Sequence, residues 1–277
     1  GSQCMSVKAW ENGPSYIDMP RSMDSYSAPV MPGLEKLRHL EGARETMRWL
    51  QDALVAKRDG PEPILADLGG LDADSREVID QILGEGEVSI SFSGETTARI
   101  QESVLAGVWR ILHVDGEGKV VADLLEVAPC PYVLSVAFED SRPVNTTVDE
   151  DAAEMANAMP ILVELADAVS QYVADGTEHS INFTLLPTTA EELEFIDTRL
   201  GRGPVNILSR AYGKCQVIST LAPNTWWVRY YNGMEKLILN TLEVVAVPAV
   251  VTAAEEDLRD SAIRLQEILA PYWRDEA

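Results

Sequence analysis

The chain has 277 residues, of which 46% are apolar, and a formal net charge of −23 at pH 7. The length and apolar content allow a well-buried core without disulfides or metal. The negative charge repels phosphate backbones and anionic lipid, so the usual electrostatic source of nucleic-acid binding is excluded and no nucleic-acid partner is expected.

The cysteines and apolar runs indicate the compartment. Cys4, Cys130 and Cys215 are far apart and match neither a disulfide framework nor a zinc motif, which suits a reducing environment. The longest apolar run, around residues 242–251, contains Glu243 and Pro248 and is too short to cross a bilayer, and no signal pattern begins the chain. We therefore expect a cytoplasmic protein with no membrane insertion.

The first part of the chain predicts an arm followed by a helix and a strand. Residues 6–33 hold four prolines and little periodicity, so an extended N-terminal arm is expected over residues 1–33. Apolar residues then recur at steps of three and four, which predicts an amphipathic helix. They are Leu37, Leu40, Met47, Leu50 and Leu54. A short strand is predicted over residues 64–68.

A second helix and a meander of strands follow. The pattern Asp74-x-x-Glu77 predicts the helix start and Gly84 its end. Residues 88–92 alternate as a strand does, and Asp115-Gly116 is a hairpin dipeptide that joins strands over residues 108–114 and 120–127. A polar stretch over residues 141–151 predicts a linker.

The remaining elements repeat this order. They are a helix from Met155 to Val173 with Pro160 either in its first turn or at a kink, a strand over 181–185, a helix announced by Thr188-x-x-Glu191, strands over 205–209 and 215–221, and a hairpin at Asn232-Gly233 between strands 226–231 and 237–244. A closing helix carries Leu258, Ala262, Leu265 and Leu269 and is predicted to end before Pro271.

An internal duplication explains this repetition. Sliding the sequence by 117 positions superimposes the halves without a gap, and the matched pairs include Ile79 and Ile196, Leu83 and Leu200, Gly86 and Gly203, Trp109 and Trp226, Gly116 and Gly233, and Pro131 and Pro248. We predict an α+β fold with two related halves, each with helices and a small antiparallel sheet. The predicted domains are the arm 1–33, a first repeat 34–140, a linker 141–151 and a second repeat 152–277 with the C-terminal helix.

The halves differ in charge. Residues 84–123 carry three basic and seven acidic residues, whereas the equivalent residues 201–240 carry five basic residues and one acidic residue. Arginine and aromatic residues are typical of protein interfaces. The candidate partner-binding residues are therefore Arg210, Tyr212, Lys214, Cys215, Trp226, Trp227, Arg229, Tyr230 and Tyr231. Under the alternative interpretation, alternate residues of 226–231 belong to the core and the charges protect strand edges.

Three further residues leave chemistry open. Lys214 precedes Cys215 and is able to lower the pKa of its thiol, although a buried apolar role is the simpler interpretation. Glu126 and Glu243 occupy equivalent positions and are either paired carboxylates for acid–base chemistry or, more simply, exposed or bonded to a nearby lysine or arginine. We assign no catalytic residue, metal ligand or cofactor.

Several segments carry a family resemblance. They are Met19–Tyr26, Leu83–Val88, Ala106–Trp109, Gly203–Cys215, Trp226–Val244 and Glu256–Ser261. With these segments the chain resembles the HupH/HyaF family of hydrogenase expression/formation proteins. The resemblance implies a non-catalytic accessory protein or chaperone for maturation of a nickel–iron uptake hydrogenase. It also implies that the protein acts on the iron–sulfur small-subunit precursor before export, beside other hydrogenase maturation proteins.

The sequence keeps another function class open. The alternative is a cysteine- or carboxylate-dependent enzyme, or a small-ligand sensor, at a cleft between the repeats. A deep pocket lined by Cys215, Glu243 and a histidine would favour chemistry, whereas an exposed aromatic patch would favour binding. The oligomeric state stays open, a homo-oligomer included.

Overall fold

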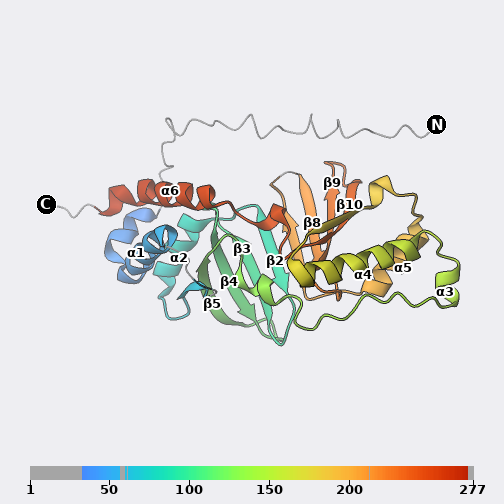
Figure 1. Ribbon diagram of the computed structural model, residues 1–277. Helices are drawn as coiled ribbons and strands as arrows, with labels where there is room; N and C mark the ends of the chain where they lie inside the picture. Colours follow the sequence, from blue (N-terminus) through green and yellow to red (C-terminus); the bar gives the residue numbers. More distant parts are fainter. Residues whose placement is uncertain (1–32, 57–59, 61, 212, 274–277) are drawn as a thin grey trace.

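A computed structural model describes residues 33–56, 60, 62–211 and 213–273. Ten antiparallel strands form a continuous sheet in the order β1-β5-β4-β3-β2-β7-β8-β9-β10-β6 (Figure 1). The strands are β1 (Ile64–Asp67), β2 (Val88–Phe92), β3 (Thr97–Glu102), β4 (Val108–Val114), β5 (Val120–Val127), β6 (His179–Asn182), β7 (Val205–Ser209), β8 (Lys214–Ser219), β9 (Thr225–Tyr231) and β10 (Leu237–Val244). The arm predicted for residues 1–33 lies outside the described residues apart from Gly33.

The two halves meet at the middle of the sheet. Strand β2 of the first half pairs with β7 of the second, and Ile90 faces Ile207. These isoleucines are 117 positions apart, so a pseudo-twofold axis passes through the pair. The strands β2 to β5 recur as β7 to β10 at the same offset. This confirms the predicted α+β fold with an internal duplication, and it shows that the repeats share one sheet.

The long α-helices cover one face of the sheet at its two ends (Figure 1). The α-helices are α1 (Glu41–Val55), α2 (Ala73–Leu83), α3 (Glu150–Ala153), α4 (Ala158–Asp175), α5 (Ala190–Leu200) and α6 (Glu255–Trp273). The short 3-10 helices are η4 (Leu34–His39), η5 (Tyr132–Val136), η6 (Phe183–Leu185) and η7 (Ala249–Val251). Helices α1, α2 and α6 form a core with β4 and β5, whereas α4 and α5 form a second core with β9 and β10. We call this side the helical face.

The opposite face carries a third core that joins both halves. Trp109 and Trp226 occupy equivalent buried positions there. Their indole N–H groups donate to the carbonyl oxygens of Ala128 and Val245, at 2.9 and 3.1 Å. The bonds satisfy polar atoms that would otherwise be costly to bury. Phe138, in the segment after η5, packs edge-on against Trp226.

The tail of each repeat packs on the other repeat. Helix α6 follows the second repeat in the chain but completes the first core, and Ser261 Oγ donates to the Ala106 carbonyl at 2.7 Å. The segment that follows the first repeat lies along the second, where the Arg142 amide donates to the Leu221 carbonyl at 2.7 Å. Arg199 donates to two carbonyls of that segment. These contacts of the two tails hold the halves together in addition to the β2–β7 pairing.

The structure corrects three predicted helix boundaries. The N-caps are Asp72, two residues before the predicted position, and Thr189, which forms a capping box with Glu192. Helix α6 continues through Pro271 to Trp273. A proline this close to the end removes only one helical hydrogen bond, and Arg38 and Arg44 donate to the carbonyls of Pro271 and Tyr272. Pro160 lies in the first turn of α4, as one of the two alternatives predicted.

Truncation of α6 tests its place in the first core. Leu265 is fully buried in that core, so Leu265→Ala should lower the free energy of unfolding by about 2–5 kcal/mol, measured by urea denaturation. Ile263 lies on the same helix and is partly exposed, so Ile263→Ala should cost less than about 1 kcal/mol. Equal effects would contradict the packing of α6 on the first repeat.

Candidate docking surface

The middle of the helical face is an open strip between the two groups of helices. Strands β3, β2, β7 and β8 separate α2, which is bonded to β4 through Asp80 and Arg110, from the core that α4 and α5 form with β9 and β10. Their side chains on this face are exposed or half-buried, except Ile218 at the end of β8, which is buried in the core under α4 and α5. We define the central strip as Ser89, Ser91, Arg99, Gln101, Leu112, Asn206, Leu208, Lys214, Gln216, Arg229 and Tyr231. A groove of about 440 Å³ runs along its first-half side.

Period two in the strands produces this surface. In β2, Val88 and Ile90 enter the core of the opposite face, so Ser89 and Ser91 point to the strip. Polar side chains bond across the strands: Ser89 Oγ donates to Gln101 Oε1 at 2.6 Å, and Gln216 Nε2 donates to Asn206 Oδ1 at 3.4 Å. The strip is therefore a polar sheet face, of the kind that antiparallel sheets present to solvent or to a partner.

In the first half, an ion-pair cluster borders the strip. The Arg110 guanidinium donates to both oxygens of Asp123, at 2.5 and 2.8 Å, and to Asp80 of α2. Burial by itself lowers the pKa of Arg110. The hydrogen bonds that Arg110 donates to Asp123 and Asp80 have the larger combined effect, so the pKa is raised. Bidentate pairing of this kind holds planar groups in one orientation. Arg110 is therefore fixed in place and joins α2 to the sheet.

In the second half, the equivalent positions of Arg110 and Asp123 are Trp227 and Asn240, and the cluster is lost. Arg229 instead lies over the Trp227 ring, 4.8 Å from its centroid. Burial, and then the charge of Arg202, lower the pKa of Arg229. Arg202 pairs with Asp197 of α5 at 2.7 Å. Arg229 thus adds a positive charge that its surroundings do not fully balance.

The strip is positive in an acidic protein. Its cations are Arg99, Lys214 and Arg229, and among the ion pairs of the described residues only Lys214 has a partner, Glu235 at 3.1 Å. The whole chain has 45 acidic and 22 basic residues. Such contrast orients an acidic partner toward the positive region.

The structure places the predicted partner-binding residues in different environments. Lys214, Arg229 and Tyr231 lie on the strip, and Lys214 Nζ lies 5.4 Å from the Tyr231 ring centroid. Arg210 is exposed beyond the end of β7. Tyr230 is half-buried on the opposite face. Tyr212 lies outside the described residues.

Three of those residues are not exposed, so the expectation of a surface that includes them is wrong. Trp226 and Trp227 are at most 1% exposed and Cys215 is 2% exposed. Because both faces of β9 are covered, Trp226 enters the core of the opposite face while Trp227 packs beneath α4 and α5. The alternative interpretation, in which alternate residues of 226–231 belong to the core, holds for Trp226 and Val228. Trp227 between them is buried as well, in the core under α4 and α5.

Sequence reasoning missed the contribution of the first half. Ser89, Ser91, Arg99 and Gln101 complete the strip, and they are the polar positions of alternating strands. The alternation that predicts β2 already marks its serines as the outward set. The pairing of β2 with β7, which brings these residues beside the second half, has no local signal in the sequence.

The residues considered for chemistry do not converge on the strip. Cys215 lies on the opposite face, where burial raises the pKa of its thiol to about 11, so the thiol is not activated. Glu126 and Glu243 lie in β5 and β10, near opposite ends of the sheet. The described residues bring together no group of three His, Cys, Asp or Glu side chains able to hold a metal ion.

Glu126 is buried and bonded to the backbone, which corrects the simpler expectation that it is exposed or paired with a basic residue. Both of its carboxylate oxygens accept from the Tyr132 amide, at 2.8 and 3.1 Å. Burial nevertheless raises the pKa of Glu126 to about 6. Burial and the charge of Glu178 also raise the pKa of Glu243.

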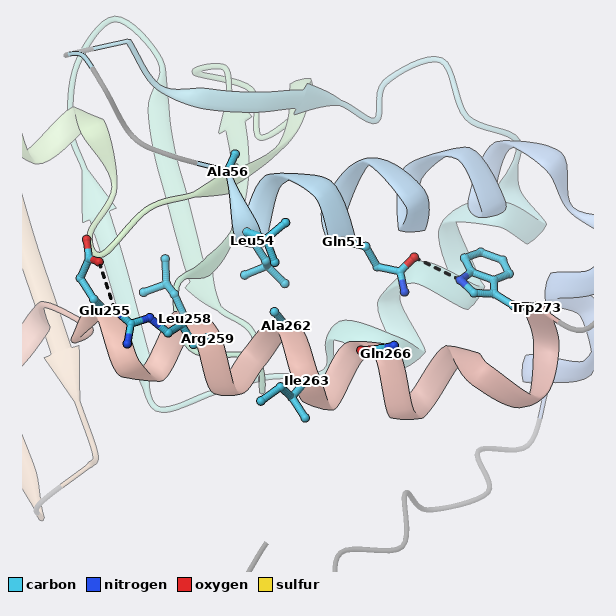
Figure 2. A pocket seen from close by; sticks show the side chains of 11 residues that line it. Gln51, Leu54, Ala56, Glu255, Leu258, Arg259, Ala262, Ile263, Gln266 and Trp273 are labelled. Carbon is cyan, nitrogen blue, oxygen red and sulfur yellow. Dashed lines mark hydrogen bonds and ion pairs between the residues drawn. The ribbon is translucent and has the colours of Figure 1, made fainter.

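A second, larger groove of about 780 Å³ lies between α1 and α6 (Figure 2). Leu54, Leu258 and Ala262 line it, and Trp273 closes one end by donating to Gln51 Oε1 at 3.1 Å. The ionisable groups in its lining are Glu255 and Arg259, which pair with each other at 4.0 Å. The lining therefore reflects helix packing and offers no nucleophile beside a base.

The fold and the strip define a class of protein: a duplicated α+β protein with an open, positive sheet surface. The family described as "HupH hydrogenase expression protein, C-terminal conserved region" matches residues 43–154 and again residues 155–272. The chain belongs to this family of hydrogenase expression/formation proteins. The two matches coincide with the two structural repeats.

Relatives match along most of the chain. "Hydrogenase expression/formation protein HupQ" of Azotobacter chroococcum mcd 1 is 43% identical over 91% of this chain and 90% of its own length. "Hydrogenase-1 operon protein HyaF" of Escherichia coli (strain K12) is 31% identical over 94% of this chain and 90% of its own. The structure of "Hydrogenase expression protein HupH from Thiobacillus denitrificans ATCC 25259" is 27% identical, with a TM-score of 0.40, over 42% of this chain and 97% of that chain.

The raised pKa of Glu126 predicts a pH-dependent stability difference. The native carboxyl holds its proton up to about pH 6, whereas the ordinary value is 4.5, so its contribution to stability is present at low pH and is lost as pH rises from 4.5 to 6. Glu126→Gln removes this loss. The unfolding free energy of the variant minus that of the wild type should rise by about 2 kcal/mol over that range. A difference that is flat with pH would contradict the buried ionisable site.

Cys215 should resist alkylation. Its burial and raised pKa predict that iodoacetamide leaves Cys215 unmodified at pH 8 in the folded protein and modifies it once urea unfolds the chain. Peptide mass spectrometry over time follows each cysteine separately. Modification of Cys215 in the native state as fast as in urea would show that the thiol is accessible.

Proposed function

We propose that this protein is a non-catalytic accessory protein, a chaperone, for maturation of a nickel–iron uptake hydrogenase. Its client is the iron–sulfur small-subunit precursor. The protein binds this precursor on the central strip, in the cytoplasm, before the precursor is exported. Other hydrogenase maturation proteins are further partners. Membership in the family of hydrogenase expression/formation proteins supports the proposal that the protein acts on a hydrogenase.

The observation that carries the proposal is the open positive strip between two helix groups. Four strands at about 4.8 Å each leave a gap of roughly 20 Å, and an α-helix is about 10 Å wide. A partner element is therefore able to lie on the sheet between α2 and α5. The strip uses residues from both repeats, so both are required for binding.

The chemistry of the strip selects its partner. Arg99, Lys214 and Arg229 attract carboxylates, and the serine, asparagine and glutamine side chains offer hydrogen bonds. Leu112 and Leu208 are half-buried and add apolar contact. A polar surface of this type releases its client more readily than a large apolar interface, which suits a protein that acts before another assembly step.

Among helices of the described residues, none is both long and apolar enough to cross a membrane. We place the proposed action in the cytoplasm because the small subunit is bound before it is exported. The three dispersed cysteines suit a reducing compartment.

Charge reversal on the strip tests the proposal. Arg99 and Lys214 are exposed and come from different halves, so Arg99→Glu with Lys214→Glu should keep the fold and lower the affinity for the purified small-subunit precursor at least about tenfold, with a weaker salt dependence. Isothermal titration at two salt concentrations measures both effects.

The matched control is Lys119→Glu, an exposed lysine in the β4–β5 hairpin away from the strip. It should leave the affinity unchanged. Pull-downs from cells that contain or lack the precursor gene show whether the client itself is captured. Recovery of the same proteins in both backgrounds, or equal loss of affinity in the control, would contradict the proposed client or the proposed surface.

A further inference from the structure

One edge of the sheet is only partly paired. Strand β6 pairs with residues 241–244 of β10, whereas β10 begins at Leu237. After β6 the chain turns into η6, which lies beside the unpaired part of β10; this is the yellow turn before α5 in Figure 1. Residues 237–240 therefore present a strand edge with no neighbouring strand among the described residues.

Exposed apolar side chains surround this edge. Leu185 of η6 is 78% exposed and Met234 in the β9–β10 hairpin is 88% exposed, and Leu186, Leu237 and Ile238 are each more than a third exposed. We call these five residues the apolar edge. Apolar residues grouped on the surface typically mark an interaction site.

The first repeat shows that the scaffold does not require this arrangement. The residue equivalent to Leu185 is Leu68, which is 1% exposed and whose amide donates to the Asp123 carbonyl at 2.8 Å, so the chain continues along β5. The residues equivalent to Leu186 and Met234 are Gly69 and Glu117. In the described part of the chain, residues 120–122 of β5 also lack a strand partner on the side away from β4, and Val120 and Val121 are exposed as Leu237 and Ile238 are. The second copy differs by the added apolar side chains of Leu185, Leu186 and Met234.

We propose that residues 237–240 accept an extended, apolar segment of the client by strand addition, with the apolar edge contacting its side chains. This inference rests on the proposed function for the identity of the client. An unpaired strand offers backbone donors and acceptors, which an extended segment satisfies and a helix does not. Alternate side chains of the added strand then reach Leu185 and Leu237.

The charges near residues 237–240, and the position of this edge beside the central strip, limit which client segments are able to bind there. Lys236 is exposed at the start of β10, and Glu235 is paired with Lys214 at 3.1 Å. The local balance favours a neutral or acidic segment over a basic one. Leu237 pairs with Tyr231 of the central strip, so one client is able to occupy the strip and the edge together, with the second contact made intramolecularly.

The experiment follows amide hydrogen exchange of residues 237–240 in the full chain. The first probe is a short synthetic peptide of alternating valine and threonine, and the second is the purified small-subunit precursor. Both should slow exchange at these amides at least about tenfold. Leu185→Ser with Ile238→Ser should remove the protection and weaken peptide binding about tenfold, which corresponds to about 1.4 kcal/mol.

The matched control is Val121→Ser, because Val121 is the equivalent of Ile238 in the first repeat and is similarly exposed. It should leave binding and exchange unchanged. Circular dichroism confirms that both variants are folded. Equal loss of peptide binding in the control would overturn the inference.

The two probes separate this inference from the proposed function. Protection by the peptide without binding of the precursor would support the edge and contradict the proposed client. Binding of the precursor with exchange unchanged at residues 237–240 would overturn the edge while the proposed function stands. Absence of protection by the peptide, or concentration-dependent protection by a second copy of the chain, would also overturn the inference.

Discussion

The pairing of β2 with β7 is the contact on which the molecule depends. It joins two repeats through five residue pairs centred on Ile90 and Ile207 and converts two short sheets into one. The opposite face gains a core that neither half builds alone. The helical face gains an open region, because the helices remain near the outer strands. The central strip is thus a consequence of how the halves join.

Duplication let equivalent positions take different tasks. In the first repeat Arg110 and Asp123 form a buried ion-pair cluster, which is expensive to place without full pairing. In the second repeat Trp227 and Asn240 occupy those positions, and because neither is charged, neither needs an ion-pair partner. The second half instead carries Arg229 over Trp227, with a charge that its surroundings do not fully balance.

Local pattern was sufficient to predict most of the elements but not the site. Alternation and the two hairpin dipeptides located the strands, and the repeat offset related the halves, because both depend on neighbouring residues. Alternation allowed one of Trp226 and Trp227 to be buried, but the burial of both could not be predicted, because composition does not say which elements cover each face of a strand. Arg99 escaped because its nearness to the second half depends on the β2–β7 pairing. The α6 end escaped because Arg38 and Arg44 reach it from a distant segment.

The exchanged tails have a consequence for the order of folding during synthesis. The first half begins at the start of the described chain, but its core includes Leu258 to Tyr272 near the other end. In a nascent chain the first core therefore stays incomplete until residues 258–272 have been synthesised. Contacts of this sequence separation slow folding and expose apolar surface meanwhile. Loss of α6 thus damages the half of the molecule that was made first.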